Sequence, residues 1–286
     1  MIDDKSKHFS CNTKEYAMAT IWINELPHPL TEGTTLFSLR AAIKPEADVI
    51  IYNGAVVSED LPLRDGDAVV YIRRGEVPEP EMLEALMAAR HTPGVHRQVK
   101  QGIVGIAGLG GLGSAIAIAL ARLGVGRLIL VDFDIVEPSN LNRQQYFVDQ
   151  IGLPKTEALC ANLRRVNPYI TLEPHSVRLT AENTAAIFKD ARILVEAFDR
   201  AEEKAQLLEA FLRAFPNRPV VAASGVAGHG PSNGIRTRQA GRITVVGDES
   251  TAAAPGAGLM APLVGVAGHH QANAVLRLLL NEKPTA

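Results

Sequence analysis

One stretch of the sequence, residues 103–132, constrains the fold more than any other; it reads IVGIAGLGGLGSAIAIALARLGVGRLILVD. An apolar run ends in a glycine-rich turn, an amphipathic segment follows, and a second apolar run leads to Asp132. This pattern predicts a strand, a turn, a helix and a second strand with an acid at its tip. The turn contains four glycines: Gly108, Gly110, Gly111 and Gly113.

Such a turn is typical of nucleotide-binding proteins. Glycines let the backbone approach a phosphate closely, and the helix that follows adds exposed N–H groups and a positive dipole end. An acid in the place of Asp132 can accept a hydrogen bond from a ribose hydroxyl. The stretch therefore predicts a nucleotide site, but it identifies neither the nucleotide nor the reaction.

Composition narrows the class of protein. The 286 residues carry a formal net charge of −2, whereas nucleic-acid binders more often carry a basic excess. The cysteines are Cys11 and Cys160, too few for a disulfide framework or a cysteine-rich zinc site. The sequence has no signal peptide and no uncharged run of about 18 residues. We therefore expect a cytoplasmic protein with no zinc, no nucleic-acid partner and no membrane span.

The pattern along the chain predicts two domains. Residues 1–18 are polar and unpatterned, which is typical of a flexible tail. Residues 19–75 follow the order strand, strand, helix, strand, strand, which is typical of a small ubiquitin-like β-grasp domain. Residues 76–81, rich in proline and glutamate, are expected to form a linker. Residues 82–286 form the larger domain.

Strands and helices alternate in the larger domain, which predicts an α/β fold with a Rossmann-like doubly wound sheet. We expect helices over residues 81–90, 112–123, 155–166, 181–188, 202–213 and 263–280. We expect strands over residues 103–107, 128–131, 169–172, 193–197 and 219–223, and two short antiparallel strands over 234–238 and 242–246. Residues 95–101 are interpreted as a crossing segment that leads into the first strand, and residues 251–258 as a small-residue loop.

Three charged side chains are expected on the ligand side of this sheet. Arg143 lies in the polar segment after the second strand, Lys155 at a helix start, and Asp199 at the end of another strand. Two cations and a carboxylate suit a triphosphate, the cations for the phosphates and the carboxylate for Mg²⁺. An NAD-dependent dehydrogenase is the competing interpretation of the glycine turn, but it has little need of this polar segment.

Four motifs together resemble the ThiF/MoeB family, the bacterial relatives of ubiquitin-activating enzymes. They are GLGGLGS at 108–114, VDFDIVEPSNLNRQ at 131–144, PKTEAL at 154–159 and EAFDR at 196–200. The small domain resembles sulfur carriers of the ThiS/MoaD type through IYNGAVV at 51–57 and LRDGDAV at 63–69. The whole chain looks most like the fused ThiF subgroup of thiamine biosynthesis.

The resemblance implies an adenylyltransferase that uses ATP and Mg²⁺ to activate the C-terminal glycine of a ThiS-type sulfur carrier, releasing pyrophosphate. Asp132 would hold the ribose and Asp199 would hold Mg²⁺. Asn140, Arg143 and Lys155 would bind the phosphates and stabilise the charge that develops on the leaving pyrophosphate. The glycine turn and Gln144 would also bind ATP. The family also uses an arginine near the start of the domain, often delivered across a homodimer, and Arg90 is its nearest match here.

Two departures from the family pattern bear on the sulfur step. Residues 249–259 contain no cysteine, so a separate donor such as a cysteine desulfurase would supply the sulfur. The small domain continues past Gly75 without a chain end, and a peptide carbonyl cannot be adenylated as a free carboxylate can. We interpret this domain as a fused docking or regulatory module; a carrier released by cleavage after Gly75 is the other interpretation.

Two alternative functions stay open at this point. The chain could be a non-catalytic or regulatory relative whose fused module occupies its own carrier groove. It could also adenylate another acceptor, such as a different carrier, a peptide or a tRNA nucleoside.

Overall fold

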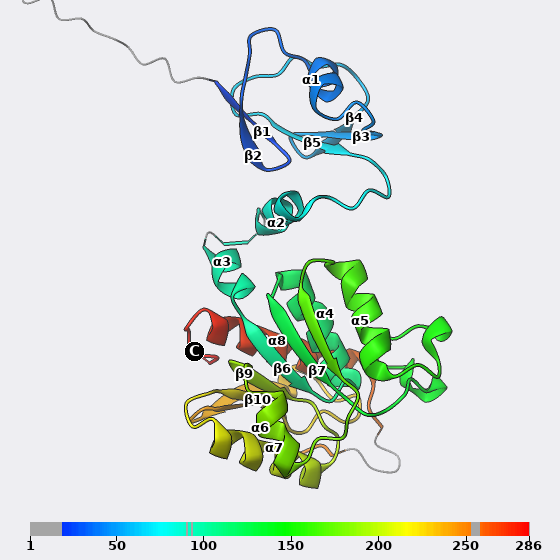
Figure 1. Ribbon diagram of the computed structural model, residues 1–286, viewed down its shortest axis with the longest axis vertical. Coiled ribbons are helices and arrows are strands. Elements are labelled where there is room, and N and C mark those ends of the chain that lie inside the picture. The colour runs from blue at the N-terminus through cyan, green and yellow to red at the C-terminus, as the bar shows by residue number, and fades with distance from the viewer. Residues whose placement is uncertain (1–18, 90, 93, 253–257, 286) are drawn as a thin grey trace, which may run out of the picture. The chain divides into compact units, whose positions relative to one another are not determined.

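Two units, Met1–Ala89 and Arg90–Ala286, divide the chain (Figure 1). The computed structural model describes residues 19–89, 91–92, 94–252 and 258–285. The predicted tail with Cys11, the site candidate Arg90 and residues 253–257 of the predicted small-residue loop lie outside the described residues.

The first unit is a five-stranded mixed sheet with a helix on one face. Its elements are β1 (Thr20–Ile23), β2 (Leu26–Pro29), α1 (Leu36–Ile43), β3 (Val49–Tyr52), β4 (Ala55–Val57) and β5 (Ala68–Ile72). The strand order is β2-β1-β5-β3-β4, with β1 and β5 parallel and the other neighbours antiparallel. This arrangement confirms the predicted β-grasp.

The prediction of four strands in this unit is wrong, because β4 forms a fifth. It has three residues, two of them exposed, so it shows no alternation of buried and exposed residues that a sequence pattern could reveal. The turn before it is formed by Asn53 and Gly54, which both have positive φ, as a tight hairpin turn requires.

Helix α1 covers the sheet because its apolar residues have partners there. Leu36 and Leu39 are buried against Ile21 and Ile50 of the strands. Thr35 caps the helix, since its hydroxyl accepts a hydrogen bond from the Ser38 N–H at 3.2 Å. Helix α2 (Pro80–Ala88) follows the sheet and begins at a proline, which suits a first helical turn.

The second unit contains a seven-stranded sheet. Its strands are β6 (Ile103–Ala107), β7 (Arg127–Val131), β8 (Thr171–His175), β9 (Ile193–Glu196), β10 (Val220–Ala223), β11 (Arg236–Ala240) and β12 (Ile243–Gly247). The order is β11-β12-β10-β9-β6-β7-β8, and only the β11–β12 pair is antiparallel. The chain winds outward from β6 in both directions, which confirms the predicted doubly wound sheet and leaves a crevice between β6 and β9.

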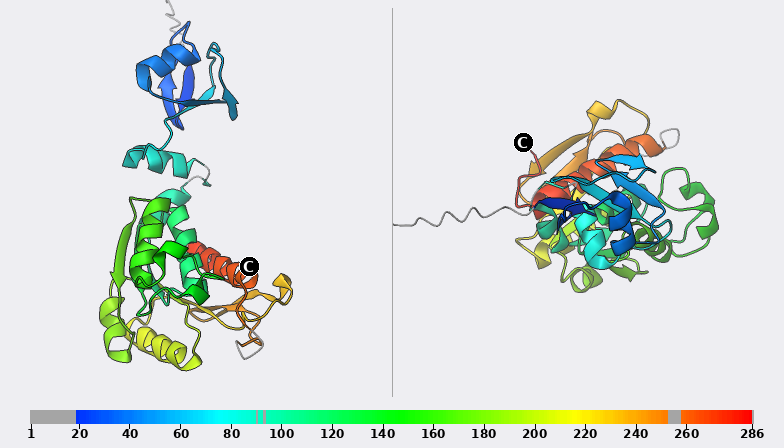
Figure 2. Two further views of the ribbon diagram at one scale, coloured as in Figure 1. Left: turned by 90° about the vertical axis from the view of Figure 1, so that its right-hand side faces the viewer. Right: turned by 90° about the horizontal axis from the view of Figure 1, so that it is seen from above.

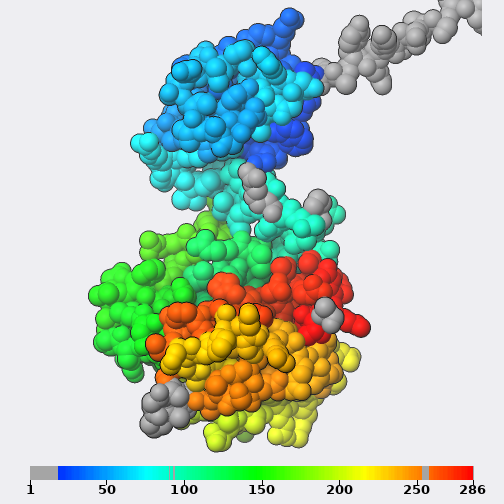
Figure 3. Space-filling view, turned by 180° about the vertical axis from the view of Figure 1, so that it is seen from behind, coloured from blue at the N-terminus to red at the C-terminus, as the bar shows by residue number. Residues whose placement is uncertain are grey.

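Helices cover both faces of this sheet (Figures 1 and 2). They are α3 (Val95–Lys100), α4 (Gly111–Leu123), α5 (Lys155–Val166), α6 (Ala181–Ile187), α7 (Ala201–Ala214) and α8 (Ala261–Leu279). Residues of α4, α5 and α8 share one buried cluster with the sheet, and residues around α6 and α7 share the other. Helix α8 also lies beside the β11–β12 hairpin on the surface seen in Figure 3. None of the helices in the described ranges has the length and hydropathy to span a bilayer.

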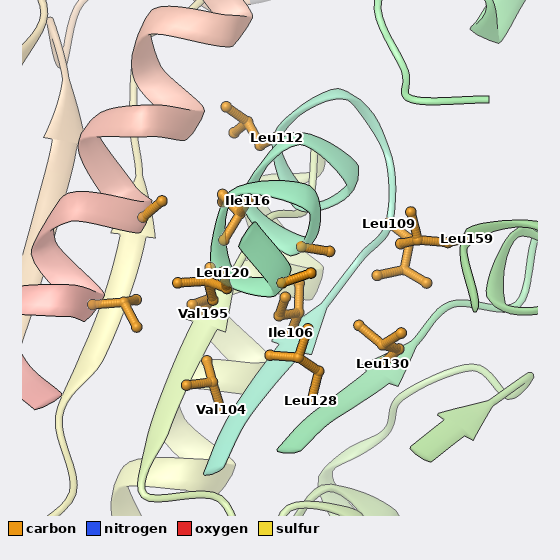
Figure 4. Close-up of a cluster of buried hydrophobic side chains, with 14 of the residues drawn as sticks. Val104, Ile106, Leu109, Leu112, Ile116, Leu120, Leu128, Leu130, Leu159 and Val195 are labelled. Carbon is orange, nitrogen blue, oxygen red and sulfur yellow. The ribbon is translucent and has the colours of Figure 1, made fainter. Parts of the chain in front are cut away.

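The larger buried cluster fixes α4 above the sheet (Figure 4). Leu112, Ile116 and Leu120 are spaced four residues apart, so they lie on one face of the helix. All three belong to the same buried cluster as Val104 and Leu128 of the two central strands. The start of α4, which carries the glycine turn, is therefore held at the carboxyl ends of these strands.

Two expectations in this unit need correction. Helix α3 occupies residues interpreted as a crossing segment; with Val99 as its one buried residue, it has no apolar periodicity to reveal it. Strand β8 begins at Thr171 and reaches His175, later than expected, because the Asn167 side chain accepts a hydrogen bond from the Tyr169 N–H and holds a turn there.

The close approach of α4 to β6 depends on two glycines. A β-carbon at Gly113 would lie 1.8 Å from the Gly108 carbonyl oxygen, far inside van der Waals contact. Gly108 itself has a φ of +89°, which only glycine adopts readily. These two residues let the helix begin directly above the end of the strand.

The substitution Gly113→Ala should lower the free energy of unfolding of the second unit by roughly 1–3 kcal/mol, because the added methyl group overlaps backbone atoms. Thermal unfolding followed by circular dichroism measures this change. Gly265→Ala in α8 is the matched control, since its β-carbon would meet no atom within 4 Å. A Gly113→Ala protein as stable as wild type would contradict the packing role of this glycine.

Candidate functional site

A cavity of about 650 Å³ opens at the carboxyl ends of β6, β7, β9 and β10. Gly108, Asp132, Ala197 and Ala223, which end or directly follow these strands, line it. Ligands of doubly wound sheets bind at this edge, beside the point where the strand order reverses. The cavity is therefore the candidate site of the second unit.

The structure brings most of the predicted site residues to this cavity. Those that line it are Gly108, Gly110, Gly111, Asp132, Asn140, Arg143, Gln144, Lys155 and Asp199. Gly113 does not line it: the residue lies within α4 against the Gly108 carbonyl, so it shapes the turn from behind. Arg90 lies outside the described residues.

The glycine turn is held by hydrogen bonds from both sides. The Gly108 N–H donates to the Val131 carbonyl at 2.9 Å, and the Tyr146 hydroxyl donates to the Leu109 carbonyl at 2.8 Å. Helix α4 begins just beyond, at Gly111, and its N-cap residue, Gly110, has no side chain to cap the first turn. The free N–H groups of this turn and the helix dipole make it a site for an anion.

Asp132 ties this turn to the end of β7. One carboxylate oxygen accepts the Leu109 N–H at 2.7 Å, and the other accepts the Asp134 N–H at 2.9 Å. Burial raises the pKa of Asp132, while the Lys155 charge and the two N–H donors oppose that rise. The sequence predicted only a ribose contact for this residue. The structure adds a second task, the orientation of the glycine turn.

Asn140 and Gln144, in the segment after β7, both line the cavity. The Asn140 side chain accepts the Glu137 N–H at 3.1 Å, and the Asn140 carbonyl accepts the N–H groups of Arg143 at 3.1 Å and Gln144 at 2.9 Å. Gln144 is buried, and its side-chain oxygen has no hydrogen-bond partner within the described residues. Asn140 therefore joins the two ends of this segment through hydrogen bonds of its side chain and its carbonyl.

Arg143 carries a positive charge that no carboxylate neutralises within the described ranges. Its terminal nitrogen donates to the Ser139 carbonyl at 3.3 Å and to the Asn142 side chain at 2.9 Å, both uncharged. Its Nε is buried and makes no hydrogen bond to a described residue. The guanidinium is thus available to an anion in the cavity.

Lys155 differs, because it already has a carboxylate partner. It begins α5, is 6% exposed, and its ammonium donates to Asp134 at 2.9 Å. An ammonium has three donors, so this bond leaves others for a ligand. Asp134 is half exposed on the cavity side and holds the ammonium in place.

Asp199 is an exposed carboxylate on the cavity wall, after β9. It makes no hydrogen bond or ion pair with the part of the chain that the structure describes. That part also holds no cluster of three His, Cys, Asp or Glu side chains fit for a metal. Mg²⁺ in phosphate sites is held by one or two carboxylates, with phosphates and waters completing the shell. Asp199 fits such a site as one ligand.

Two interactions at the cavity were not predicted from the sequence. Glu196, fully buried at the end of β9, pairs with Lys204 of α7 at 3.2 Å. Arg178, after β8, stacks on the Phe133 ring at 3.9 Å and pairs with Glu203 at 2.7 Å. An acid at the end of an apolar strand was the one available signal, and it pointed to Glu196. Nothing in the sequence pattern joins Arg178 to Phe133.

Two family models match the chain. The ThiF family model matches residues 85–286, and the model for ThiS-like ubiquitin matches residues 19–75. Molybdopterin-synthase adenylyltransferase of Escherichia coli (strain K12) is 34% identical over 187 residues, which are 63% of this chain and 74% of that protein. SAMP-activating enzyme E1 of Haloferax volcanii is 32% identical over 181 residues, 60% of this chain and 64% of that enzyme.

A solved structure shares the fold of the second unit. It is E. coli tRNA N6-threonylcarbamoyladenosine dehydratase, TcdA, in complex with ATP, with a TM-score of 0.64 and 21% identity. The match covers 72% of this chain and 98% of that one. The sequence motifs, the sheet and the family models agree. The chain belongs to the ThiF family and carries a ThiS-like ubiquitin domain.

Proposed function

We propose that this protein is an ATP-dependent adenylyltransferase that activates the C-terminal carboxylate of a ubiquitin-like carrier protein. The observation that carries the proposal is the set of groups around one cavity. A glycine turn, Arg143, the buried Lys155 and Asp199 line it together, and within the described residues neither Arg143 nor Asp199 has a charged partner. The names of the relatives, an adenylyltransferase and an E1 enzyme, support the same reaction.

In the proposed reaction, a carboxylate oxygen of the carrier attacks the α-phosphorus of ATP. The new carbon–oxygen–phosphorus link forms as the bond from the α-phosphorus to the bridging oxygen breaks, and pyrophosphate leaves with that electron pair. Both reactants are anions, so positive charge is needed to bring them together. Arg143, Lys155 and the N–H groups at the start of α4 supply that charge in this chain.

The remaining predicted residues have supporting roles in this proposal. Asp132 accepts a hydrogen bond from the ribose, and Gln144 offers its unpartnered buried oxygen to a donor. Asp199 would hold Mg²⁺, whose charge offsets that of the phosphates. We assign Arg90 the role of a further cation at the site, by the family resemblance alone.

The acceptor we favour is a separate ThiS-type carrier, as in thiamine biosynthesis. The ThiS-like unit of this chain cannot be the acceptor while intact, because the chain continues beyond the last strand, which ends at Ile72, through Gly75 into Glu76. Local contacts hold this segment: the Lys44 ammonium lies 2.6 Å from the Glu76 carboxylate, and the Arg74 N–H donates to Asp48 at 2.9 Å. A free, extended carboxyl end is thus absent from the described part of this unit.

Further proposals follow from the family pattern. The protein acts in the cytoplasm as a homodimer, and a separate cysteine desulfurase supplies the sulfur, since residues 249–259 contain no cysteine. Activation of a tRNA nucleoside is the second candidate function, favoured by the fold shared with TcdA. The net charge of −2 weighs against it, because tRNA carries dense negative charge.

Removal of one charged group from the cavity should slow the reaction strongly. Arg143→Ala, Lys155→Ala and Asp199→Ala should each slow carrier-dependent exchange of pyrophosphate into ATP by about 10²–10³-fold. The first two remove positive charge that offsets the charge of the phosphates, and the third removes the proposed ligand of Mg²⁺. The exchange of labelled pyrophosphate measures this. Exposed residues away from the cavity give the matched controls Arg213→Ala, Lys189→Ala and Asp149→Ala. Near-normal exchange in Asp199→Ala would rule out its role with the metal.

The fused module should not replace the carrier. Purified protein should show the intact 286-residue mass and no exchange until a carrier ending in Gly-Gly is added, because only a free carboxylate can attack ATP. A carrier lacking its last glycine is the control. Exchange without any carrier, or with tRNA in its place, would overturn the proposed acceptor.

A further inference from the structure

A carboxylate is buried directly beneath the cavity. Glu196, the last residue of β9, is 0% exposed. One of its oxygens accepts the Phe198 N–H at 2.7 Å, and the other lies 3.2 Å from the Lys204 ammonium. Lys204 also donates to the Ala223 carbonyl at the end of β10, and it lines the cavity.

Stability alone gives a weak reason for this pair. Removing two charges from water is costly, and well-packed apolar side chains in place of a buried pair are often equally stable or more so. Burial raises the pKa of Glu196, and the Lys204 charge opposes that rise. The pair is costly to bury and lies beneath a ligand cavity, which favours a role in holding the neighbouring backbone in a fixed conformation.

The backbone that this pair holds is the turn formed by residues 197–199. Glu196 holds it through the Phe198 N–H, and the buried Gln271 of α8 holds the preceding backbone by donating to the Glu196 carbonyl at 3.1 Å. The turn packs tightly on the glycine loop, because a β-carbon at Gly108 would lie 2.9 Å from both the Phe198 ring and the Ala197 carbonyl. Asp199 is the last residue of this turn. Its exposed carboxylate makes no hydrogen bond or ion pair with a described residue, so its position depends on the backbone of the turn.

We propose that Glu196 is a positioning residue, which with Lys204 fixes the turn of residues 197–199 so that Asp199 faces the metal-bound triphosphate. Glu196 touches neither nucleotide nor metal in this scheme. It acts through the Phe198 backbone, and the Lys204 ammonium, 3.2 Å from the other carboxyl oxygen, helps to hold the side chain in place. The inference rests on the part of the proposed function that places ATP and Mg²⁺ in this cavity, and on no property of the carrier.

The test is calorimetric titration of ATP into wild type, Glu196→Gln, Asp199→Ala and the double variant, with excess Mg²⁺ and with a chelator. Loss of a residue that supports a metal ligand weakens metal-dependent binding by about 10–100-fold. We expect that loss for Glu196→Gln in Mg²⁺, with less than about a twofold change in the chelator. In the Asp199→Ala background, Glu196→Gln should weaken binding no further, because the two residues act on the same contact.

A residue that merely stabilises the fold would behave differently. It would weaken ATP binding equally with and without Mg²⁺, and its effect would add to that of Asp199→Ala; either result overturns the inference. Glu173→Gln is the matched control, since it removes a carboxylate paired with Arg127 away from the cavity lining and should leave ATP affinity unchanged. If Glu196→Gln does not fold, Lys204→Gln tests the same link and should show the same Mg²⁺-selective loss.

The titration also separates this inference from the proposed function. Wild-type protein that binds Mg²⁺ and ATP but catalyses no carrier-dependent exchange would refute the proposed function. The ATP affinities of the variants would still decide the role of Glu196. Wild-type protein that does not bind ATP would refute both.

Discussion

The hydrogen bond from the Leu109 N–H to the Asp132 carboxylate joins the two halves of the nucleotide cavity, and much of the surrounding structure serves it. On one side, Gly108 and Gly113 let the backbone fold tightly enough for this N–H to reach β7. On the other side, Asp132 also accepts the Asp134 N–H, and Asp134 in turn holds Lys155. A side chain added at Gly113 would push this arrangement apart, because no space remains for it.

The charges around the cavity are divided between groups that are paired and groups that are not. Lys155 and Lys204 have carboxylate partners, so their positions are set before any ligand arrives. Arg143 and Asp199 have no charged partner in the described residues. Polar groups that are held in advance need little rearrangement during a reaction, which is the basis of electrostatic catalysis. In the proposed function, these two groups contact the triphosphate and its metal.

Local sequence signals predicted the fold well where residues repeat at regular spacing. The apolar residues of α4 and the glycines before it are visible without any structure, and the motifs at 131–144 and 154–159 placed Arg143 and Lys155 near that turn. Short elements with a single buried residue or none, such as α3 and β4, were missed because they lack a period. Glu196 was seen as part of a motif, but its partner was not, since a lysine inside an amphipathic helix resembles any solvated charge.

The sequence by itself determined the doubly wound sheet, the β-grasp unit and the residue types that reach the cavity, because spacing and backbone preference act over a few residues. Tertiary structure alone decided which of those residues are paired. Glu196 meets Lys204 because α7 lies beside β9. Arg178 stacks on Phe133, and Asp132 turns to the glycine backbone, because the strand order brings the ends of β6, β7 and β8 together. Charge pairing depends on distances across the sheet edge, and no local pattern along the chain records those distances.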